Sequence, residues 1–365
     1  MNWLTKPIPG TAPDGAAILS VLGKKTYTIK NGGKAVPDEE EQLPFHESDE
    51  YYGEGNPQTD AVKYESDLVA FKPMTDIVVI GNACAPKGKK AYHLDVSCQV
   101  GDAKKTLRVF GNRRVYVTGT GIAFSDPEPF EELPTHYGLA YGGMDEQSED
   151  DMQYAYLKNP VGKGFIVRKN PAALQDLPLP NLEDPAKLLT PGNLVLQKFE
   201  NWKQYPEPAG LGYTGRNFYP RYTLSGLPPD AYQENEIIRQ QHMQQMPEIG
   251  TTPSSQPPPS TPLMNYQFFN GASPGLQLPY LNGAEDISLV YMDPDHPQFS
   301  FQLPGDRPSA WLDAGEGPEE MQMVLHTVEV LKGSNQLAMV WRGSAYYGGP
   351  EAMEEFEAFE FGVEA

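Results

Sequence analysis

The sequence is poor in cysteine and has no long apolar run, and each shortage excludes a class of protein. Two cysteines, Cys84 and Cys98, are too few for a disulfide framework, and their spacing is not that of a zinc site, so we expect buried free thiols. No run of about 18 apolar residues is present, which argues against a transmembrane helix. The first residues lack a basic region followed by an apolar run, so we expect no signal peptide and a cytoplasmic location.

Positive charge is also scarce. The 365 residues include 28 lysines and arginines but 49 aspartates and glutamates, which gives a formal net charge of −21. Such a chain is repelled by phosphate backbones and by anionic lipid surfaces, so we expect neither a nucleic acid nor a membrane as partner. The excess of acidic residues instead favours a basic partner protein.

Proline, glycine and aromatic residues are abundant. There are 36 prolines and 35 glycines, and 11% of the residues are aromatic. Average proteins contain about 5% proline and about 7% glycine, so turns are frequent in this chain, and the aromatic residues can supply a core. The composition predicts a mainly β fold: an antiparallel β-sandwich or barrel-like core with long loops rich in proline and aromatic residues and with few helices.

Several segments carry strand patterns. The segment AYHLDVSCQV (91–100) alternates apolar and polar residues, which is the period of a half-buried strand. With its neighbours it predicts an antiparallel meander of three or four strands over residues 76–118. Asn31–Gly33 and Gly333–Asn335 are turn signals that predict hairpins. The acidic tail (350–365) either covers a sheet edge or acts as a short acidic motif.

Composition divides the chain into three parts. Residues 1–228 form a predicted N-terminal β-rich domain, which ends in irregular segments rich in proline and aromatic residues. Residues 229–264 combine one helical pattern, which starts at Asp230, with a proline-rich linker or insertion. Residues 265–365 are strand-like again, and they either complete the same core or form their own.

The sequence contains none of the common catalytic motifs. The segment GLGYTG (210–215) matches the dinucleotide fingerprint by letter, but no strand precedes it and no helix follows it, so we interpret it as an aromatic-rich loop. The segment DPDH (293–296) offers metal ligands, yet a turn between two strands explains it fully. His93 and His326 lie within strand patterns, where a packed or solvent-facing histidine is expected. We therefore expect no cofactor, no metal and no catalytic residue.

The basic residues gather in one part of the chain. They mark either a solvated face or an anchoring patch, and such a patch would hold an acidic partner or this chain's own acidic loops. If it holds a partner, reversing the charges of Arg113 and Arg114 is expected to abolish capture without unfolding the protein. The cluster consists of Lys87, Lys89, Lys90, Lys104, Lys105, Arg108, Arg113 and Arg114.

Segments spread over nearly the whole chain carry a family resemblance. Taken together and in this order, they resemble the bacterial family of adaptors that serve effectors of the type VI secretion system. The segments are YESDLVAFKPMTDIVVIGNACAPKGK (64–89), LRVFGNRR (107–114), YGG (141–143), NPVGKGF (159–165), QFFNGASPGLQ (267–277) and VWRG (340–343).

The resemblance implies a cytoplasmic adaptor or chaperone without catalytic chemistry, which binds a toxic effector and loads it onto a VgrG or PAAR spike protein. Two other classes stay open: a hydrolase-like enzyme whose site combines scattered Asp, His and Arg residues, and a structural component of the secreted spike. Partner contacts would be broad and would use charged and aromatic side chains; in the alternative interpretation the aromatic ones fill a core. The candidate contact residues are Arg108, Arg113, Arg114, Tyr141, Phe165, Phe268 and Phe269.

Overall fold

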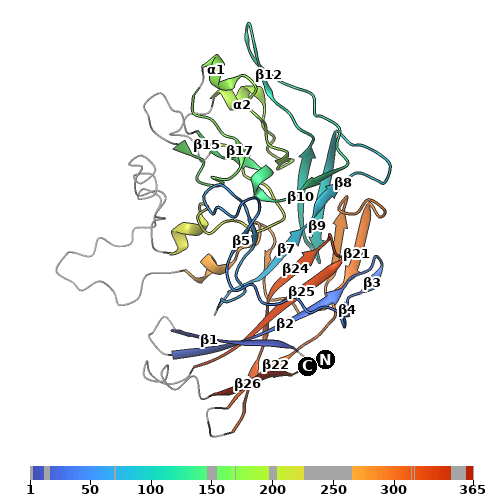
Figure 1. Cartoon of the computed structure of the whole chain (residues 1–365), viewed down its shortest axis with the longest axis vertical. Helices are drawn as coiled ribbons and strands as arrows, with labels where there is room; N and C mark the ends of the chain where they lie inside the picture. Colours follow the sequence, from blue (N-terminus) through green and yellow to red (C-terminus); the bar gives the residue numbers. More distant parts are fainter. Residues whose placement is uncertain are drawn as a thin grey trace, which may run out of the picture.

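The structure, a computed structural model, consists mainly of β-strands and turns (Figure 1), which confirms the predicted fold class. None of the sheets in the described part of the chain closes into a barrel. The predicted helix and linker of residues 229–264 lie outside the described residues. The predicted domain boundaries remain predictions. The described residues are 3–11, 17–69, 71–145, 154–168, 170–196, 204–225, 265–313, 315, 317–346 and 359–364.

The largest sheet, the main sheet, takes strands from both ends of the chain (Figure 1). Its strands in spatial order are β1 (Leu4–Thr11), β2 (Ala17–Thr28), β25 (Gln336–Tyr346), β24 (Val324–Leu331), β7 (Thr75–Ile80) and β19 (Gln277–Leu278), and β4 (Val36–Pro37) also pairs with β2. The predicted hairpin around Gly333–Asn335 is confirmed as β24 and β25, and Asn335 has the positive φ of 53° that its turn requires. The pair β24 and β7 is parallel.

The second sheet lies on one side of the main sheet. Its strands in spatial order are β18 (Leu182–Glu183), β10 (Ala103–Phe110), β9 (His93–Val100), β20 (Asp286–Val290), β21 (Gln298–Gln302) and β3 (Gly33–Lys34). The apolar face predicted for β9 is confirmed at Val96, Cys98 and Val100, which are all buried, but Ser97 on the predicted polar face is buried too, and Tyr92 stands just before the strand and is 59% exposed. Strands from before residue 229 and after residue 264 alternate within both sheets.

The predicted meander over residues 76–118 is wrong, because only β9 and β10 are neighbours in it. β7 lies in the main sheet between β24 and β19. The run Ile77–Ile80 is apolar on both faces. Such a run fits a central strand whose two faces are both covered by other parts of the protein, and it does not fit a meander with one solvated face. The turn-rich segment after it therefore carries the chain from one sheet to the other. On the way, β8 (Asn82–Cys84) pairs with β13 (Glu132–Pro134).

The two sheets share one apolar core. The main sheet contributes side chains such as Val79 and Val330, and the second sheet contributes Cys98, Leu289 and Phe301, all at most 3% exposed. Each such side chain contributes roughly 1.5–3 kcal/mol when it is fully buried. Cys84 and Cys98 are free and buried, as predicted, and burial raises the pKa of Cys98 to about 12.

Two smaller parts flank this core at opposite ends (Figure 1). At one end β26 (Glu360–Glu364) pairs with β22 (Ser309–Asp313), whose other neighbour is β23 (Glu319–Gln322), so the described part of the acidic tail, residues 359–364, covers a sheet edge. At the other end an aromatic second core contains Tyr141, Tyr156 and Phe165. It is built on α1 (Pro171–Leu174), α2 (Pro191–Leu196), and the pairs β11 (Val115–Thr118) with β12 (Gly121–Phe124), β14 (Tyr141–Gly142) with β17 (Lys163–Gly164), and β15 (Met144–Asp145) with β16 (Tyr154–Ala155).

Candidate functional site: the polar face of the main sheet

The face of the main sheet that is turned away from the shared core carries charged side chains. Because strand residues alternate between faces, the register of β2, β25, β24 and β7 places Lys24, Arg342, Thr327, Glu329 and Asp76 on the same side. All five are at most 7% exposed. Burial of this much charge is costly unless every group is paired, so loops must cover this face and supply partners. We call this face and its loop partners the polar layer.

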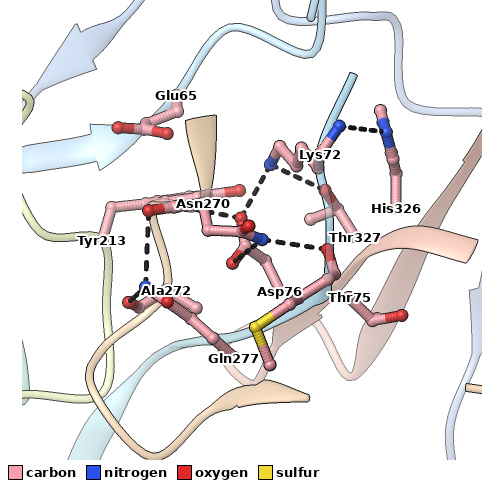
Figure 2. A network of polar contacts seen from close by, with 12 residues as sticks. Glu65, Lys72, Thr75, Asp76, Tyr213, Asn270, Ala272, Gln277, His326 and Thr327 are labelled. Carbon is pink, nitrogen blue, oxygen red and sulfur yellow. Dashed lines mark hydrogen bonds and ion pairs between the residues drawn. The ribbon is translucent and has the colours of Figure 1, made fainter. Parts of the chain in front are cut away.

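The centre of the polar layer is an ion pair between Lys72 and Asp76 (Figure 2), with 2.8 Å between Nζ and Oδ2. The Lys72 ammonium also donates to the Thr327 hydroxyl at 3.1 Å. Asp76 accepts from the Asn270 side-chain amide at 3.0 Å and from the Gly271 backbone amide at 2.9 Å. Two loops far apart in sequence are therefore tied to β7 through a single carboxylate.

His326 is a histidine of the polar layer (Figure 2), and its Nε2 atom is already occupied by hydrogen bonds within the protein. Its Nε2 accepts from the Lys72 backbone amide at 2.9 Å and from Arg342 Nε at 3.0 Å. The ring is therefore neutral, with its proton on Nδ1. Burial, reinforced by the charges of Arg342 and Lys72, holds the pKa of His326 well below its ordinary value. Because its only lone pair is in use, His326 acts as a hydrogen-bond acceptor and not as a general base.

A second ion pair fastens the loops to one another. The Arg221 guanidinium forks onto the Glu65 carboxylate, with 2.9 Å between Nη2 and Oε2, and its Nε donates to the Phe268 carbonyl at 2.8 Å. Gly271 lies directly against Glu65, so that a Cβ at this position would overlap the carboxylate. The close approach of the Glu65 carboxylate, and not the conformation of a turn, therefore explains why residue 271 is a glycine.

Glu329 connects the loops to β24. Its carboxylate accepts from the Tyr213 hydroxyl at 3.0 Å and lies 3.7 Å from His46 Nε2. Burial, followed by the charge of Glu329, raises the pKa of Tyr213 well above its ordinary value. Paired in this way, the polar layer is arranged to hold three loop segments rigidly on the sheet. Among its described side chains, the Asn270 Oδ1 atom is buried and accepts no hydrogen bond, and Arg342 donates to His326 and Ser344 without a carboxylate within ion-pair distance.

His136, at the edge of these loops, makes the fold sensitive to acid. Its Nδ1 accepts from the Gly138 backbone amide at 3.1 Å, and its ring stacks on Tyr52 with 4.0 Å between the ring centroids. Burial lowers the pKa of His136 to about 4, and the charge of Lys163 acts in the same direction. The folded protein therefore keeps this ring neutral at pH values at which the unfolded chain protonates it.

We expect the free energy of unfolding to fall by roughly 2 kcal/mol between pH 7 and pH 5 through His136 alone. A histidine with a lowered folded-state pKa stabilises the fold above its unfolded-state pKa of about 6.5, and this contribution is lost as the pH falls toward the folded-state value. Urea unfolding at both pH values measures it, with His136→Gln, which retains the acceptor, as the comparison. Equal losses in the two proteins would contradict the assignment.

The aromatic residues predicted to contact a partner divide into two groups. Tyr141 and Phe165 are buried in the second core. The centroid of the Tyr156 ring lies 5.1 Å from that of Tyr141 and 5.6 Å from that of Phe165. They are therefore core residues, as the alternative interpretation held. Phe268 and Phe269 are half-buried in a short 3₁₀ turn beside Arg221, so for these two residues contact with a partner stays a prediction.

Three residues of the predicted basic patch pair with acids of this chain. Arg108 makes two bonds of 2.7 Å to Asp95 on the neighbouring strand, Lys87 pairs with Asp295, and Lys90 lies 3.7 Å from Glu131. Because these pairs are exposed, as are Lys89, Lys104 and Arg114, most of the patch fits the alternative of a solvated face with surface ion pairs.

The expectation that the charges of Arg113 and Arg114 can both be reversed without unfolding the protein does not fit the structure, because the two side chains have different surroundings. Arg113 is 8% exposed, is ion-paired with Glu183 and lies over the Phe110 ring. Arg114, the next residue in an extended segment, points the opposite way and is exposed. Reversing the charge of Arg113 would leave Glu183 buried beside a second acid, so we expect this variant to unfold.

The two motif interpretations made from the sequence hold in the structure. The 210–215 segment is a loop, and the Leu211 backbone bridges Thr135 and Val79 by two hydrogen bonds of 3.0 Å. The 293–296 segment is a turn, in which Asp293 accepts from the backbone amides of Asp295 and His296. The described residues contain no group of three or more His, Cys, Asp or Glu side chains placed to hold a metal.

A cleft of about 680 Å³ opens where the parallel strands β7 and β24 end. Sequence reasoning missed its histidine, His46, although the residue stands in an acidic segment, LPFHESDE. His46 Nδ1 lies 3.2 Å from Glu50, and its Nε2 faces Glu329. Burial opposes protonation of this ring, but the bond to Glu329 and its charge outweigh burial, so the pKa of His46 is raised. The other polar side chains of the wall include Cys84, Glu132, Asp293, Lys332 and Ser334.

Residues 14–342 match the family described as an uncharacterized protein conserved in bacteria, DUF2169. The chain belongs to this family. The range matched to DUF2169 contains the second sheet, the polar layer, the cleft and the main sheet except β1 and the last residues of β25. No curated protein and no solved structure matches the chain. Among the described residues no helix is long and apolar enough to cross a membrane.

Proposed function

We propose that this chain is a non-catalytic adaptor or chaperone of the bacterial cytoplasm. It binds a type VI secretion effector and promotes loading of that effector onto a VgrG or PAAR spike protein. The polar layer carries the proposal: side chains that could serve acid-base chemistry, namely Lys72, Asp76, His326 and Glu329, bond to the chain's own loops. Loops fixed in advance form a surface that loses little conformational entropy when a partner binds.

Charge and resemblance give further support. The net charge of −21 steers a basic client, such as a nucleic-acid-cutting toxin, toward this surface. The segments that resemble the adaptor family include those that build the polar layer: FKPMTD supplies Lys72 and Asp76, and QFFNG supplies Asn270 and Gly271. The resemblance therefore lies in the part of the chain that fixes the loops.

Deletion of the gene tests the proposal in cells. We expect the toxin encoded beside it to disappear from the culture medium, while the secreted tube of the same machine is still released and this chain stays in the cells. Unchanged secretion of the toxin would contradict the proposal. Release of this chain into the medium together with the toxin would instead identify it as a structural component of the spike.

One observation favours a second candidate, a hydrolase-like enzyme. The His46 imidazole lies between two carboxylates, those of Glu50 and Glu329, at the wall of an open cleft, which is a placement that suits a group that exchanges a proton with a substrate. If this candidate holds, the purified protein hydrolyses an activated ester faster than buffer does, and His46→Gln loses that excess rate. Equal rates for the two proteins would exclude His46 as the acid-base group.

A further inference from the structure

We propose that the cleft beside the ends of β7 and β24 is a docking site for a lysine or arginine side chain on an extended segment of the partner protein. The identity of the partner rests on the proposed function, whereas the chemistry of the ligand rests on the cleft alone. Three features of the cleft support this assignment: the sign of its charge, the nature of its walls and the rigidity of its base.

Acidic groups outnumber cations at the cleft. Its wall contains the carboxylates of Glu132, Asp293 and Asp295 and one ammonium group, that of Lys332. Lys332 is neutralised by Asp293, with 2.6 Å between Nζ and Oδ2, and Lys87 offsets Asp295 from outside the wall. Beyond the wall, Glu50 and Glu329 flank His46.

Glu132 is the carboxylate left for a ligand. It is exposed, accepts a bond of 2.9 Å from the Asn82 side-chain amide, and has no cation within ion-pair distance in the described part of the chain. A carboxylate that is oriented by an amide donor and lacks a counter-ion is suited to a charged hydrogen bond with an incoming cation. Burial, followed by the charges of Glu132 and Asp293, raises the pKa of Cys84 to about 11, which agrees with a negative field at this wall.

The rest of the wall suits the carbon stem of a basic side chain. The Tyr52 and Tyr64 rings line the cleft, and each is held by stacking on a histidine, with 4.0 and 4.3 Å between centroids. A lysine or arginine stem packs on apolar surface while its head stays polar, and an aromatic ring attracts a cation placed over its face. Because the Lys63 Nζ already lies 5.0 Å from the Tyr64 ring centroid, Tyr52 is the ring of the two that can receive a further cation. The apolar side chains of the wall are Leu43, Pro44, Ile80, Pro134, Met292, Pro294 and Leu331.

The base of the cleft is formed in advance. Lys332 is 7% exposed, donates to Asn335 Oδ1 at 2.5 Å in addition to Asp293, and its Nζ lies 4.1 Å from the Phe299 ring centroid. Gly81 lies so close to the Lys332 Cβ that a side chain at residue 81 would displace it. A cleft whose own cation is fixed in this way does not collapse onto Glu132, which stays available to a ligand.

A labelled peptide tests the ligand chemistry directly. The probe is a fluorescein-labelled hexapeptide with one central arginine between apolar residues, and the matched probe carries citrulline, which has the same shape without the charge. Fluorescence polarisation with the full-length wild-type chain is expected to show at least about 10-fold tighter binding of the arginine probe. Equal binding of the two probes, or no binding of the arginine probe, would overturn the proposal.

Two variants locate the site. Glu132→Lys is expected to weaken binding of the arginine probe at least about 10-fold, because it places a like charge at the ligand's position. Glu131→Lys is the matched control: it makes the same charge change at the neighbouring residue, which is 71% exposed, lies outside the wall and is 3.7 Å from Lys90, and we expect a change of less than about twofold. Ser334→Trp, which fills the cleft from an exposed turn without a change of charge, is expected to act like Glu132→Lys.

The same proteins are then mixed with the effector. Loss of effector binding in Glu132→Lys, but not in Glu131→Lys, supports the cleft as the docking site. Equal capture by both variants would overturn the proposal and leave the adaptor function standing. Binding of the arginine probe without capture of any effector would leave the cleft standing and overturn the adaptor function. If the wild-type chain forms a dimer that Glu132→Lys dissociates, a second copy of the chain occupies the cleft, and this result would overturn the proposal.

Discussion

Replacing Asp76 with alanine is expected to lower the free energy of unfolding by roughly 3–5 kcal/mol. The carboxylate is fully buried and holds Lys72, the Asn270 side chain and the Gly271 backbone amide. Without it, the buried Lys72 ammonium loses its counter-ion and keeps the Thr327 hydroxyl as acceptor, the Gly271 amide loses its acceptor, and two loops lose their common anchor. Chemical denaturation followed by circular dichroism measures the loss.

Two comparisons show that burial causes the effect. Asp95→Ala removes a carboxylate from an equally well-formed ion pair with Arg108, but Asp95 is 48% exposed, so we expect a loss of only about 0–1 kcal/mol. The double variant Lys72→Met with Asp76→Leu removes both buried charges together and is expected to be more stable than Asp76→Ala alone. If Asp76→Ala costs no more than Asp95→Ala, the polar layer does not hold the loops.

Replacing Gly142 with alanine is expected to cost more than about 4 kcal/mol or to prevent folding. Gly142 belongs to the YGG segment and has a φ of +151°, which side chains rarely adopt, and a Cβ there would overlap the backbone oxygen of Asn159. The Asn159 amide, which is fully buried, donates to the carbonyls of Tyr137 at 2.9 Å and of Tyr141 at 3.1 Å. The clash therefore falls on rigid backbone, and expression level and thermal unfolding report it.

Gly119→Ala is the matched control for Gly142→Ala. A Cβ on Gly119 meets nothing within 4 Å, and its φ is an ordinary one, so the change of unfolding free energy is expected to stay within about 1 kcal/mol. If Gly142→Ala and Gly119→Ala have the same thermal unfolding midpoint, the YGG and NPVGKGF segments are not packed tightly against each other.

Local patterns predicted the strands whose partners are close in sequence. The alternation in β9 and the turn around Gly333–Asn335 each report a neighbour within a few residues. The partner of β7 is β24, about 250 residues away, and an apolar run fits any central strand, so no local signal distinguishes this pairing from a meander. The mainly β character was therefore predictable, whereas the assignment of strands to sheets was not.

The contacts that form the candidate site could not be predicted from the sequence for a similar reason. In the sequence, Lys72 belongs to no motif, Asp76 stands at the start of an apolar strand pattern, and His326 fits a packed or solvent-facing histidine within a strand. Their meeting depends on the parallel register of β7 with β24, which places Thr327 beside Asp76. Residue type alone also does not separate Arg113 from Arg114, because facing inward or outward depends on the strand geometry and not on the side chain.

The central claim is that this chain acts by holding a partner on a surface fixed in advance. Size-exclusion chromatography with light scattering of the purified chain, the effector encoded beside it and the spike protein tests it most directly. The account predicts that all three elute as one complex, and that intact-mass spectrometry finds the effector chemically unchanged after incubation. Separate elution of this chain from both proteins at micromolar concentrations, or a changed mass of the effector, would contradict it.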